Sequence, residues 1–363
     1  MLTPFCYACA SLHTDAVSAV LIETDTNSIL YEKNAYSKMP MASTTKIMTA
    51  ICAIESGVLD KKSEIHPSAV GVEGSSVYLK KGEQLTLEEL LYGLMLHSGN
   101  DAAVAIAYAV SGSVEDFVFL MNETAQRIGA LNTHFENPNG LDGKEHYTTA
   151  YDLALITSYG LKNPVFKKIV STYSASISGP RELRNHNKLL KMYDGCIGVK
   201  TGFTKKSGRC LVSGATRNQT ELVAVTLNDG NDWTDHIKML DYGFENTQSV
   251  QLLKKGEYLK KIPVKDGEEL YCDVQCSDDF YITVKKGEFP KYRIEYFTDD
   301  FIQAPANKGD CAGTVNIVLD AEKIISCKAV LKDNVLKKKR TPFIEKFINI
   351  YTFWLDCVSE NLG

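Results

Sequence analysis

Hydrophobic and polar positions along the first two thirds of the chain follow two periods, which predicts an α/β domain. Alternation with a period of two is typical of half-buried strands, and apolar residues at i, i+3 and i+4 are typical of amphipathic helices. The predicted strands are 17–22, 29–32, 196–201, 210–216 and 222–227, and the predicted helices are 43–56, 86–97, 101–110 and 233–244.

Short local signals place several helix ends. Thr86 followed by Glu89 forms the pattern of a capping box, in which each side chain satisfies the other residue's backbone N–H group. Thr149 and Asp152 repeat that spacing, which predicts a helix beginning near residue 150. Gly57 follows the 43–56 segment and predicts its end, because glycine adopts the left-handed conformation of a helix C-terminus.

The pattern changes near Val250 to short strand-like runs separated by turns, which predicts a second, all-β domain. This part of the sequence contains no pairing of a nucleophile with a base. We therefore divide the chain into an α/β domain at 16–248 and an all-β domain at 249–335. The predicted strands of the second domain are 271–274, 281–284, 292–297, 314–319 and 324–331.

Both ends of the chain carry apolar segments. Residues 1–10 are apolar and end in Ala8-Cys9-Ala10, the small-x-small form of a signal-peptidase site. We interpret residues 1–15 as the remnant of a secretion signal, and the alternative is a frayed apolar terminus.

At the other end, residues 336–363 combine a basic run, Lys337 to Arg340, with an amphipathic helical pattern. Such a helix is typical of an anchor that lies in a membrane interface, with its lysines near anionic head groups. The alternative is a helix that docks on the protein's own surface. The apolar face consists of Phe343, Phe347, Ile350, Tyr351, Trp354 and Val358.

Composition excludes several classes of protein. The 363 residues include 44% hydrophobic and 23% charged residues, which is ordinary for a folded soluble protein and unlike a disordered or polytopic membrane chain. The net charge is −5, which argues against non-specific binding of nucleic acid. We predict no metal or other cofactor, because the histidines lack ligand spacing and the cysteine pair Cys272 and Cys276 has no second pair. Cys196 and Cys210 are not expected to form a disulfide, since the predicted register pairs Cys196 with a residue near 215.

A hydroxyl and an amine stand three residues apart in Ser43-Thr44-Thr45-Lys46, at the start of a predicted helix. Residues at i and i+3 share a helix face, so the Lys46 amine can reach the Ser43 oxygen. A neighbouring neutral amine converts a serine into a good nucleophile. The alternative is an N-capping serine, and about two S-x-x-K matches are expected by chance in such a chain.

Two further motifs favour a nucleophilic Ser43 over an N-capping serine. Ser98-Gly99-Asn100 falls between two predicted helices and offers a hydroxyl for proton relay and an amide for a substrate carbonyl. Lys200-Thr201-Gly202 lies in a predicted strand, where Thr201 can bind a carboxylate and Gly202 lets a substrate backbone approach the strand edge. About one S-x-N match and roughly 0.2 K-T-G matches are expected by chance, so the three in this order are a strong signal.

The three motifs in this order resemble the penicillin-interacting serine enzymes. The surroundings resemble the low-molecular-mass penicillin-binding proteins that act as serine D-alanyl-D-alanine carboxypeptidases. The similar segments are STTKIMTA from Ser43, MLHSGNDAAVAIA from Met95, NPNGL from Asn137, NKLL from Asn187 and GVKTGFTKKSGRCLV from Gly198.

The resemblance implies a role for each motif residue. Ser43 is the acylated nucleophile, Lys46 its general base, and Ser98 and Asn100 the hydroxyl and amide of the second motif. By the same analogy the oxyanion hole consists of the backbone N–H groups of Ser43 and Phe203, and the strand wall of the cleft consists of Lys200, Thr201 and Gly202. Phe203 stands where the family often has His, which leaves a backbone donor unaffected.

The implied fold is a penicillin-binding, serine β-lactamase-like α/β domain, with an antiparallel sheet flanked by helices, followed by a small all-β domain and a C-terminal amphipathic helix. The implied activity is removal of the terminal D-Ala from peptidoglycan stem peptides at the extracytoplasmic face of the bacterial membrane, with covalent inhibition by β-lactams. Some members bind the terminal carboxylate with an Arg after the third strand, and residues 228–236 contain none. Thr201, Lys200 and Arg217 remain alternatives for that role.

Three other functions remain as rivals. A D,D-endopeptidase or weak transpeptidase would use the same residues. A β-lactamase is disfavoured because no Glu-x-x-Leu-Asn segment follows Ser98, and a non-catalytic muropeptide-binding protein is disfavoured because Ser43 and Lys46 are both present.

Overall fold

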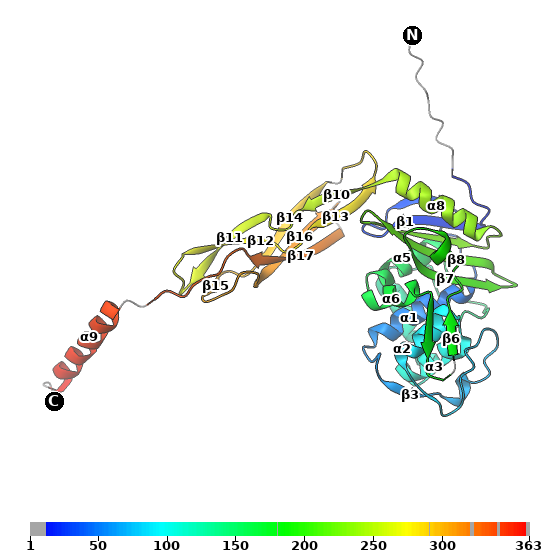
Figure 1. Ribbon diagram of the computed structural model, residues 1–363, viewed down its shortest axis with the longest axis horizontal. Helices are drawn as coiled ribbons and strands as arrows, with labels where there is room; N and C mark the ends of the chain where they lie inside the picture. Colours follow the sequence, from blue (N-terminus) through cyan, green and yellow to red (C-terminus); the bar gives the residue numbers. More distant parts are fainter. Residues whose placement is uncertain (1–11, 180, 290, 320–322, 340–341, 361–363) are drawn as a thin grey trace, which may run out of the picture. The chain divides into compact units, whose positions relative to one another are not determined.

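The computed structural model describes residues 12–179, 181–289, 291–319, 323–339 and 342–360. The chain forms two compact units (Figure 1). The first comprises the described residues up to Ser249 together with Thr283–Gly287, and the second comprises Val250–Ile282 and the described residues from Glu288 onward. The first eleven residues of the predicted signal remnant at 1–15 lie outside the described residues.

A five-stranded antiparallel sheet forms the centre of the first unit, in the order β2-β1-β9-β8-β7. Cys196 lies opposite Ala215 and Cys210 lies opposite Gly202, which confirms the predicted register and separates the two cysteines. The strand β7 therefore forms an edge of the sheet. The strands are β1 (Ser18–Glu23), β2 (Ile29–Lys33), β7 (Cys196–Thr204), β8 (Gly208–Arg217) and β9 (Thr220–Leu227).

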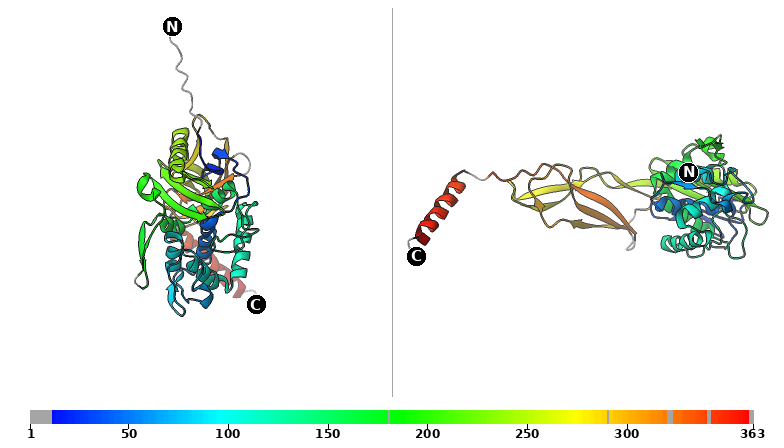
Figure 2. Two further views of the ribbon diagram at one scale, coloured as in Figure 1. Left: turned by 90° about the vertical axis from the view of Figure 1, so that its right-hand side faces the viewer. Right: turned by 90° about the horizontal axis from the view of Figure 1, so that it is seen from below.

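Helices cover both faces of this sheet. The helix α8 (Asp232–Asn246) packs on one face, against β1, β8 and β9, while α5 (Ala150–Leu161) and α6 (Pro164–Ser171) pack on the other. Figures 1 and 2 show this separation from three directions. Beyond α5 and α6 lie α1 (Lys46–Glu55), α2 (Leu87–Leu96), α3 (Asn100–Ser111) and α4 (Val114–Ile128). Shorter elements complete the unit: η1 (Ala42–Thr45), β3 (Lys62–Glu64), η2 (Pro67–Ala69), β4 (Gln84–Thr86), β5 (Ser174–Ile177), β6 (Arg181–Arg184) and α7 (Leu189–Met192).

The two predicted capping boxes differ in how completely they form. At α2 the capping box is complete, because the Glu89 backbone N–H donates to Thr86 and the Glu89 carboxylate accepts from the Thr86 N–H. At α5 the Thr149 hydroxyl accepts from the Asp152 N–H at 3.0 Å. The Asp152 carboxylate instead accepts hydrogen bonds from the Asn132 N–H and the Thr133 hydroxyl, so tertiary contacts replace the second half of that box.

The prediction of one helix over 43–56 is wrong at its beginning. Residues Ala42–Thr45 form a 3₁₀ turn, and the α-helix α1 begins at Lys46. Ala42 has a φ of 48°, which turns the chain sharply before Ser43. Ser43 therefore lies within the turn and is not the N-cap of α1, since Thr45 occupies that position.

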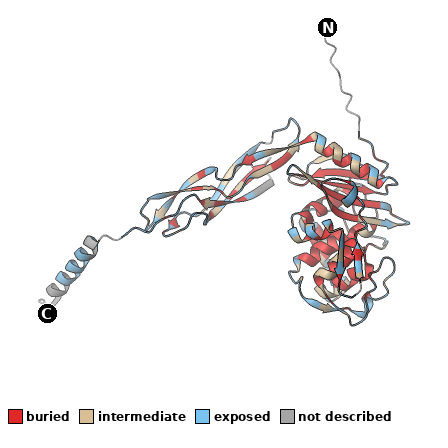
Figure 3. Ribbon diagram, in the orientation of Figure 1, coloured by how far each residue is buried: buried red, intermediate tan, exposed pale blue. Residues whose placement is uncertain are grey.

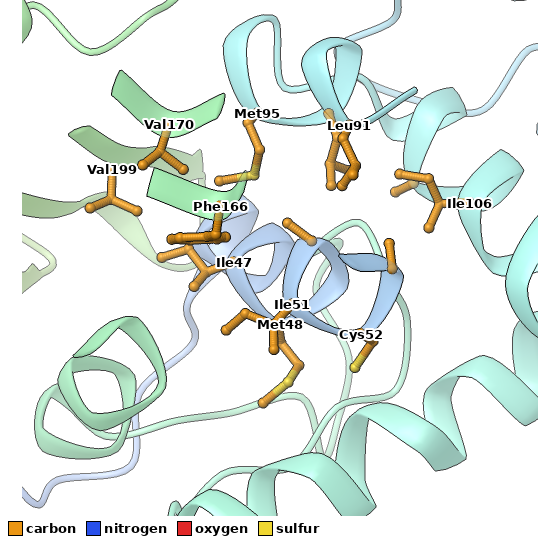
Figure 4. Close-up of a cluster of buried hydrophobic side chains, with 14 of the residues drawn as sticks. Ile47, Met48, Ile51, Cys52, Leu91, Met95, Ile106, Phe166, Val170 and Val199 are labelled. Carbon is orange, nitrogen blue, oxygen red and sulfur yellow. The ribbon is translucent and has the colours of Figure 1, made fainter. Parts of the chain in front are cut away.

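The helix α1 runs through the hydrophobic core of the first unit. Ile47, Met48 and Ile51 are almost fully buried, and Figure 4 shows them surrounded by side chains from α2, α3, α6 and β7. Figure 3 shows the same concentration of buried residues around α1 and within the sheet. The residues of α1 that follow the nucleophile motif are thus held by a close-packed core, which limits their movement.

The second unit is built from strands, as predicted. Its six-stranded sheet has the order β14-β16-β17-β12-β11-β15, and β10 (Thr247–Leu253) pairs with β13 (Phe280–Lys285) in a separate ladder. Val274, Ile317 and Leu331 are buried in its core. The sheet comprises β11 (Tyr258–Lys265), β12 (Tyr271–Cys276), β14 (Tyr292–Thr298), β15 (Ile302–Gln303), β16 (Cys311–Leu319) and β17 (Lys323–Leu331), and the helix α9 (Pro342–Glu360) follows.

No single helix among the described residues is long and apolar enough to cross a membrane; α3 and α4, bent by 86°, meet the length and composition criteria only as a pair.

The burial of Leu91 leads to a stability prediction. Leu91 is fully buried between α1 and its neighbours, whereas Leu131 is 74% exposed. Leu91→Ala should lower the free energy of unfolding by about 2–5 kcal/mol through lost burial and a residual cavity. Leu131→Ala should stay within about 0.5 kcal/mol of the wild type. Urea denaturation of both variants checks the prediction, and equal losses would contradict the assignment of the core.

Candidate active site

The Lys46 amine and the Ser43 hydroxyl lie together where the 3₁₀ turn meets α1. The Lys46 Nζ donates to Ser43 Oγ at 2.9 Å. It also donates to Asn100 Oδ1 at 2.7 Å and to the backbone oxygen of Asn139. Lys46 is fully buried, and its protonated form has three N–H donors for these three oxygens; in the neutral form the Ser43 hydroxyl donates to the amine instead.

The surroundings of Lys46 favour its neutral form. Burial is the largest cause that lowers the pKa of Lys46 well below 10.5, and the nearby Lys200 cation lowers it further. The Asp101 carboxylate acts in the opposite direction and raises the pKa. A buried amine beside a serine oxygen is suited to accept a proton, because its neutral form carries a free lone pair.

The second motif occupies the sharp turn between α2 and α3, as predicted. Ser98 adopts a φ of 61°, which is uncommon for a residue with a side chain. The Asn100 side chain donates to the Glu73 backbone oxygen at 2.5 Å and accepts from Lys46, so its orientation is determined from both ends.

Asp101 supports this turn and was not singled out by the sequence. Its buried carboxylate accepts hydrogen bonds from the backbone N–H groups of Val77 and Leu79 and from the Ser76 hydroxyl. It therefore ties the loop before α2 to the start of α3. An Asp in the first turn of a helix is ordinary, so the sequence carried no signal for this additional role.

Lys200 joins the third motif to the second. Its amine donates to Ser98 Oγ at 3.0 Å, and the residue is 2% exposed. Burial lowers the pKa of Lys200 to about 7. Two short chains of polar groups therefore meet in the site: Ser43–Lys46–Asn100 and Ser98–Lys200.

Two glycines allow separate parts of the chain to approach Ser43. A Cβ at Gly202 would lie 3.0 Å from the Ser43 nitrogen, and a Cβ at Gly140 would lie 2.0 Å from the Ala42 oxygen. Gly140 also has a φ of +89°. The edge strand β7 and the 137–141 loop consequently contact the turn that carries the hydroxyl, and Phe203 next to Gly202 is 66% exposed.

An open cavity of about 460 Å³ lies over these residues. It includes Ser43, Ser98, Thr201, Gly202 and Phe203 among the predicted residues. The sequence reasoning missed its other lining residues, which are Ser75, His186, Arg209, Cys210, Asp232 and Trp233.

Two arginines of β8 differ in their position relative to the cleft. Arg209 lines it and could have been found from the strand register, whereas Arg217 does not line it. Arg209 lies opposite Phe203 in the β7–β8 ladder, and its guanidinium forms a bidentate pair with Asp232 at 2.7 and 3.0 Å. Arg217 donates to the Asp194 backbone oxygen and stacks on the Tyr193 ring at 4.4 Å. Arg217 is not among the residues that line the cleft.

Two buried histidines, His146 and His236, have structural partners. His236 is buried between the hydroxyls of Ser213 and Thr226, and burial lowers its pKa to about 3. His146 interacts with the Thr45 hydroxyl at 2.8 Å. No group of three or more His, Cys, Asp or Glu residues that could hold a metal is found within the residues the structure describes.

The site and fold match a known family of enzymes. A family model of D-alanyl-D-alanine carboxypeptidases matches residues 7–231, which is more than half of the chain. The chain belongs to this family. A second model, the C-terminal domain of penicillin-binding protein 5, matches residues 248–337.

Two of the similar proteins match nearly the whole chain, and a third matches its first two thirds. It is 34% identical to the D-alanyl-D-alanine carboxypeptidase DacF of Bacillus subtilis over 356 residues, covering 94% of this chain and 92% of the relative. The crystal structure of DacD from Francisella tularensis is similar with a TM-score of 0.66 and 28% identity, over 93% of this chain and 98% of that one. A mutant of a Streptomyces DD-transpeptidase is 34% identical, with a TM-score of 0.61, over 64% of this chain and 99% of that one. The predicted family, fold class and enzyme class are confirmed.

The lowered pKa of Lys200 has a measurable consequence for stability. Its pKa is about 7 in the folded chain against 10.5 ordinarily, so between these values the unfolded chain binds the extra proton. The free energy of unfolding of the wild type, minus that of the Lys200→Met variant, should therefore rise as pH increases from 7 toward 10. The rise should be at most about 1.4 kcal/mol per pH unit. The substitution also removes the Lys200 charge that lowers the pKa of Lys46. The stability of the variant should therefore depend less on pH, which increases the difference from the wild type in the same direction. Urea denaturation of both proteins at pH 7, 8 and 9 measures it, and a pH-independent difference would show that Lys200 stays protonated.

Proposed function

We propose that this chain is a serine D,D-carboxypeptidase that removes the terminal D-Ala from peptidoglycan stem peptides through an acyl-enzyme on Ser43. The observation that carries the proposal is the fully buried Lys46 amine, 2.9 Å from Ser43 Oγ and with a pKa well below its ordinary value. This pair supplies the nucleophile and the base that acyl transfer requires.

The acylation step follows from the placement of the polar groups. Neutral Lys46 takes the proton as Ser43 Oγ attacks the carbonyl carbon of the penultimate D-Ala. The backbone N–H groups of Ser43 and Phe203 stabilise the oxyanion, and the close approach of Gly202 to the Ser43 nitrogen supports this pairing. Asn100 holds Lys46 in position by accepting a hydrogen bond from its amine.

Departure of D-Ala requires a proton on its nitrogen. Ser98 lines the cleft and is hydrogen-bonded to Lys200, whose pKa of about 7 lets it exchange a proton at neutral pH. The amide C–N bond breaks as the nitrogen receives this proton. Water then attacks the ester carbonyl, and its proton passes through Ser98 to Lys200. Ser43 Oγ takes back the proton held by Lys46 as the shortened peptide is released.

Arg209 is our candidate for binding the terminal carboxylate, in place of the three alternatives left by the sequence. It lines the cleft beside Thr201 and Phe203, while Asp232 holds its guanidinium from behind. A guanidinium has five donors, so pairing with Asp232 leaves others for a substrate carboxylate. Thr201 and Lys200 supply the remaining polar contacts at this end.

β-Lactams fit the same scheme as inhibitors. A penicillin acylates Ser43, but its leaving amine stays tethered within the adduct, where the ring obstructs water. The D-Ala of a peptide diffuses away instead. A β-lactamase would need a dedicated base for deacylation, and the sequence contains no Glu-x-x-Leu-Asn segment after Ser98.

We also propose that the protein is exported and held at the extracytoplasmic membrane surface by α9. Phe347, Ile350 and Trp354 of this helix are exposed, and a basic run precedes it. An aromatic helix with neighbouring lysines fits an anionic membrane interface.

The nucleophile and base are tested by substitution. Ser43→Ala should abolish both peptidase activity and labelling by a fluorescent penicillin, and Lys46→Ala should slow acylation by ~10²–10⁴-fold. Ser56→Ala, after the other end of α1, should leave both activities unchanged. Intact-mass measurement of the wild type should show one penicilloyl adduct on the Ser43 peptide that persists for minutes. Rapid repeated hydrolysis of penicillin without an adduct would identify a β-lactamase.

The role of Arg209 is tested with two peptides that differ only at their end. Arg209→Gln should reduce kcat/KM roughly tenfold for a peptide ending in a free D-Ala carboxylate, because a charged hydrogen bond is lost. It should have little effect on the same peptide ending in an amide. Arg217→Gln, the matched control, should affect neither. Equal losses on both peptides would mean that Arg209 acts only on the structure of the cleft.

The membrane role of α9 is tested by deletion of residues 342–363. The truncated protein should lose binding to liposomes that contain anionic lipid while retaining full activity on a soluble peptide. Raising the salt concentration should weaken binding of the full-length chain, because part of the attraction is electrostatic. Equal partitioning of both proteins would refute the anchor.

A further inference from the structure

A single arginine beside the turn of the β5–β6 hairpin binds the loop before α2. Arg181 is the first residue of β6, and its guanidinium makes five hydrogen bonds. It donates to the backbone oxygens of Val77 at 2.8 Å, Tyr78 at 2.9 Å and Ser178 at 2.8 Å. The other two bonds go to the two carboxylate oxygens of Glu83, at 2.6 and 2.8 Å. A guanidinium has five N–H donors, so each of them has a partner.

The Arg181–Glu83 pair is more enclosed than an ordinary surface pair. The Arg181 side chain is 13% exposed and that of Glu83 is 21% exposed. In the Arg127–Glu55 pair, which has the same shortest distance of 2.6 Å, the corresponding fractions are 53% and 33%. Exposed pairs contribute little to stability, whereas loss of one partner of an enclosed pair leaves polar groups unsatisfied. The two pairs therefore provide a matched comparison.

The same loop contacts the second motif at Asn100. We refer to residues 73–79 of this loop as the 73–79 segment. Asn100 donates from its backbone N–H to the Ser75 oxygen at 2.7 Å and from its side chain to the Glu73 oxygen at 2.5 Å. A Cβ at Gly74 would lie 2.6 Å from the Asn100 side-chain nitrogen. The segment thus approaches Asn100 more closely than a residue with a side chain would allow.

Arg181 and Asp101 bind complementary groups of the 73–79 segment. The Asp101 carboxylate accepts hydrogen bonds from the N–H groups of Val77 and Leu79, at 3.0 and 3.1 Å. At Val77 the N–H group therefore bonds to Asp101 and the oxygen bonds to Arg181. A carboxylate and a guanidinium together determine the position of one short stretch of backbone.

The hairpin that carries Arg181 is itself attached to α2. The Ser178 backbone N–H donates to a Glu89 carboxylate oxygen at 2.9 Å, and the Ser178 hydroxyl donates to the same oxygen. Glu89 is the residue that completes the capping box of α2, and α2 packs against α1. Arg181 therefore extends from a fixed element, so it restricts the 73–79 segment and does not simply move with it.

The Asn100 side chain connects the 73–79 segment to the Lys46 amine. Its nitrogen donates to Glu73, and its Oδ1 accepts from Lys46 Nζ at 2.7 Å. Release of the segment would free Asn100 and open a path for water to the amine. Because burial is the largest cause of the lowered pKa of Lys46, hydration would return that pKa toward 10.5. A larger protonated fraction of Lys46 would accept the Ser43 proton less readily.

We propose that Arg181 is a positioning residue for acylation, which holds the 73–79 segment against Asn100 and thereby keeps the Lys46 amine oriented and away from water. Arg181 is not among the residues that line the cleft, so it acts through the segment and not on the substrate. The inference rests on the proposed function, because acylation of Ser43 is the step that it affects.

The first test measures acylation by a fluorescent penicillin from pH 5 to pH 10. In Arg181→Gln the rise of the acylation rate with pH should move to higher pH by about one unit, which makes the rate about tenfold lower at a given pH on that rise. The difference should shrink at the highest pH, where Lys46 is neutral in both proteins. Lys200 and Asp101, the charged groups that act on Lys46, remain in place in the variant.

Two further variants accompany Arg181→Gln. Arg127→Gln, the matched control, removes a guanidinium paired with Glu55 at the other end of α1 from Lys46, and it should keep the wild-type profile. Arg181→Lys keeps the charge opposite Glu83 but loses the planar fork that reaches both backbone oxygens, so it should move the profile in the same direction by less. It replaces Arg181→Gln in the comparison if that variant does not fold.

The second test measures the 73–79 segment independently of activity, by amide hydrogen exchange. In Arg181→Gln the amides of Val77 and Leu79 should exchange on the order of tenfold faster, because the segment opens more often. Arg127→Gln should leave their exchange unchanged.

Each contrary result has a distinct meaning. If the Arg181 variants acylate at the wild-type rate, or are slower by the same factor at every pH, Arg181 supports only the fold and the inference is wrong. A moved profile with unchanged amide exchange overturns the route through the 73–79 segment. A wild type that neither binds penicillin nor cleaves peptide overturns the proposed function, and the role of Arg181 in acylation with it.

Discussion

The chemistry of this protein depends on removing the Lys46 amine from water. In solvent a lysine amine is protonated at neutral pH and cannot act as a base. Here the side chain is fully buried and a second buried cation, Lys200, stands nearby, so the protonated form is disfavoured twice. The amine retains hydrogen bonds to Ser43, Asn100 and Asn139, which satisfy its polar hydrogens without restoring a full counter-charge.

Such an arrangement demands a rigid frame, because a small opening would admit water and restore the ordinary pKa. The core around α1 supplies that frame from one side. From the other side, Gly202 and Gly140 let β7 and the 137–141 loop approach the 3₁₀ turn. A Cβ at Gly140 would collide with the backbone of the turn, and a Cβ at Gly202 would require a small displacement of it. Asp101 completes the enclosure by binding the backbone of the loop before α2. The residues that shape the site are thus more numerous than those that carry its chemistry.

The two buried lysines also divide the cleft by function. In the proposed mechanism, Lys46 serves the bond that forms at Ser43, and Lys200, through Ser98, serves the bond that breaks. Groups on the Lys200 side therefore act on the leaving portion of a substrate.

The sequence by itself was enough to predict the candidate catalytic residues, because S-x-x-K, S-x-N and K-T-G are local patterns whose order is already informative. It also determined the strand register near Cys196 and the complete cap at Thr86, since both depend on neighbouring residues. It could not locate the beginning of α1, where the positive φ of Ala42 and contacts from distant segments override helix periodicity. The pairing of Arg209 with Asp232 and the contacts of Asp101 were decided by tertiary structure alone. Each acts through residues far away in the chain, and a pattern of nearest neighbours carries no information about which distant charges will meet.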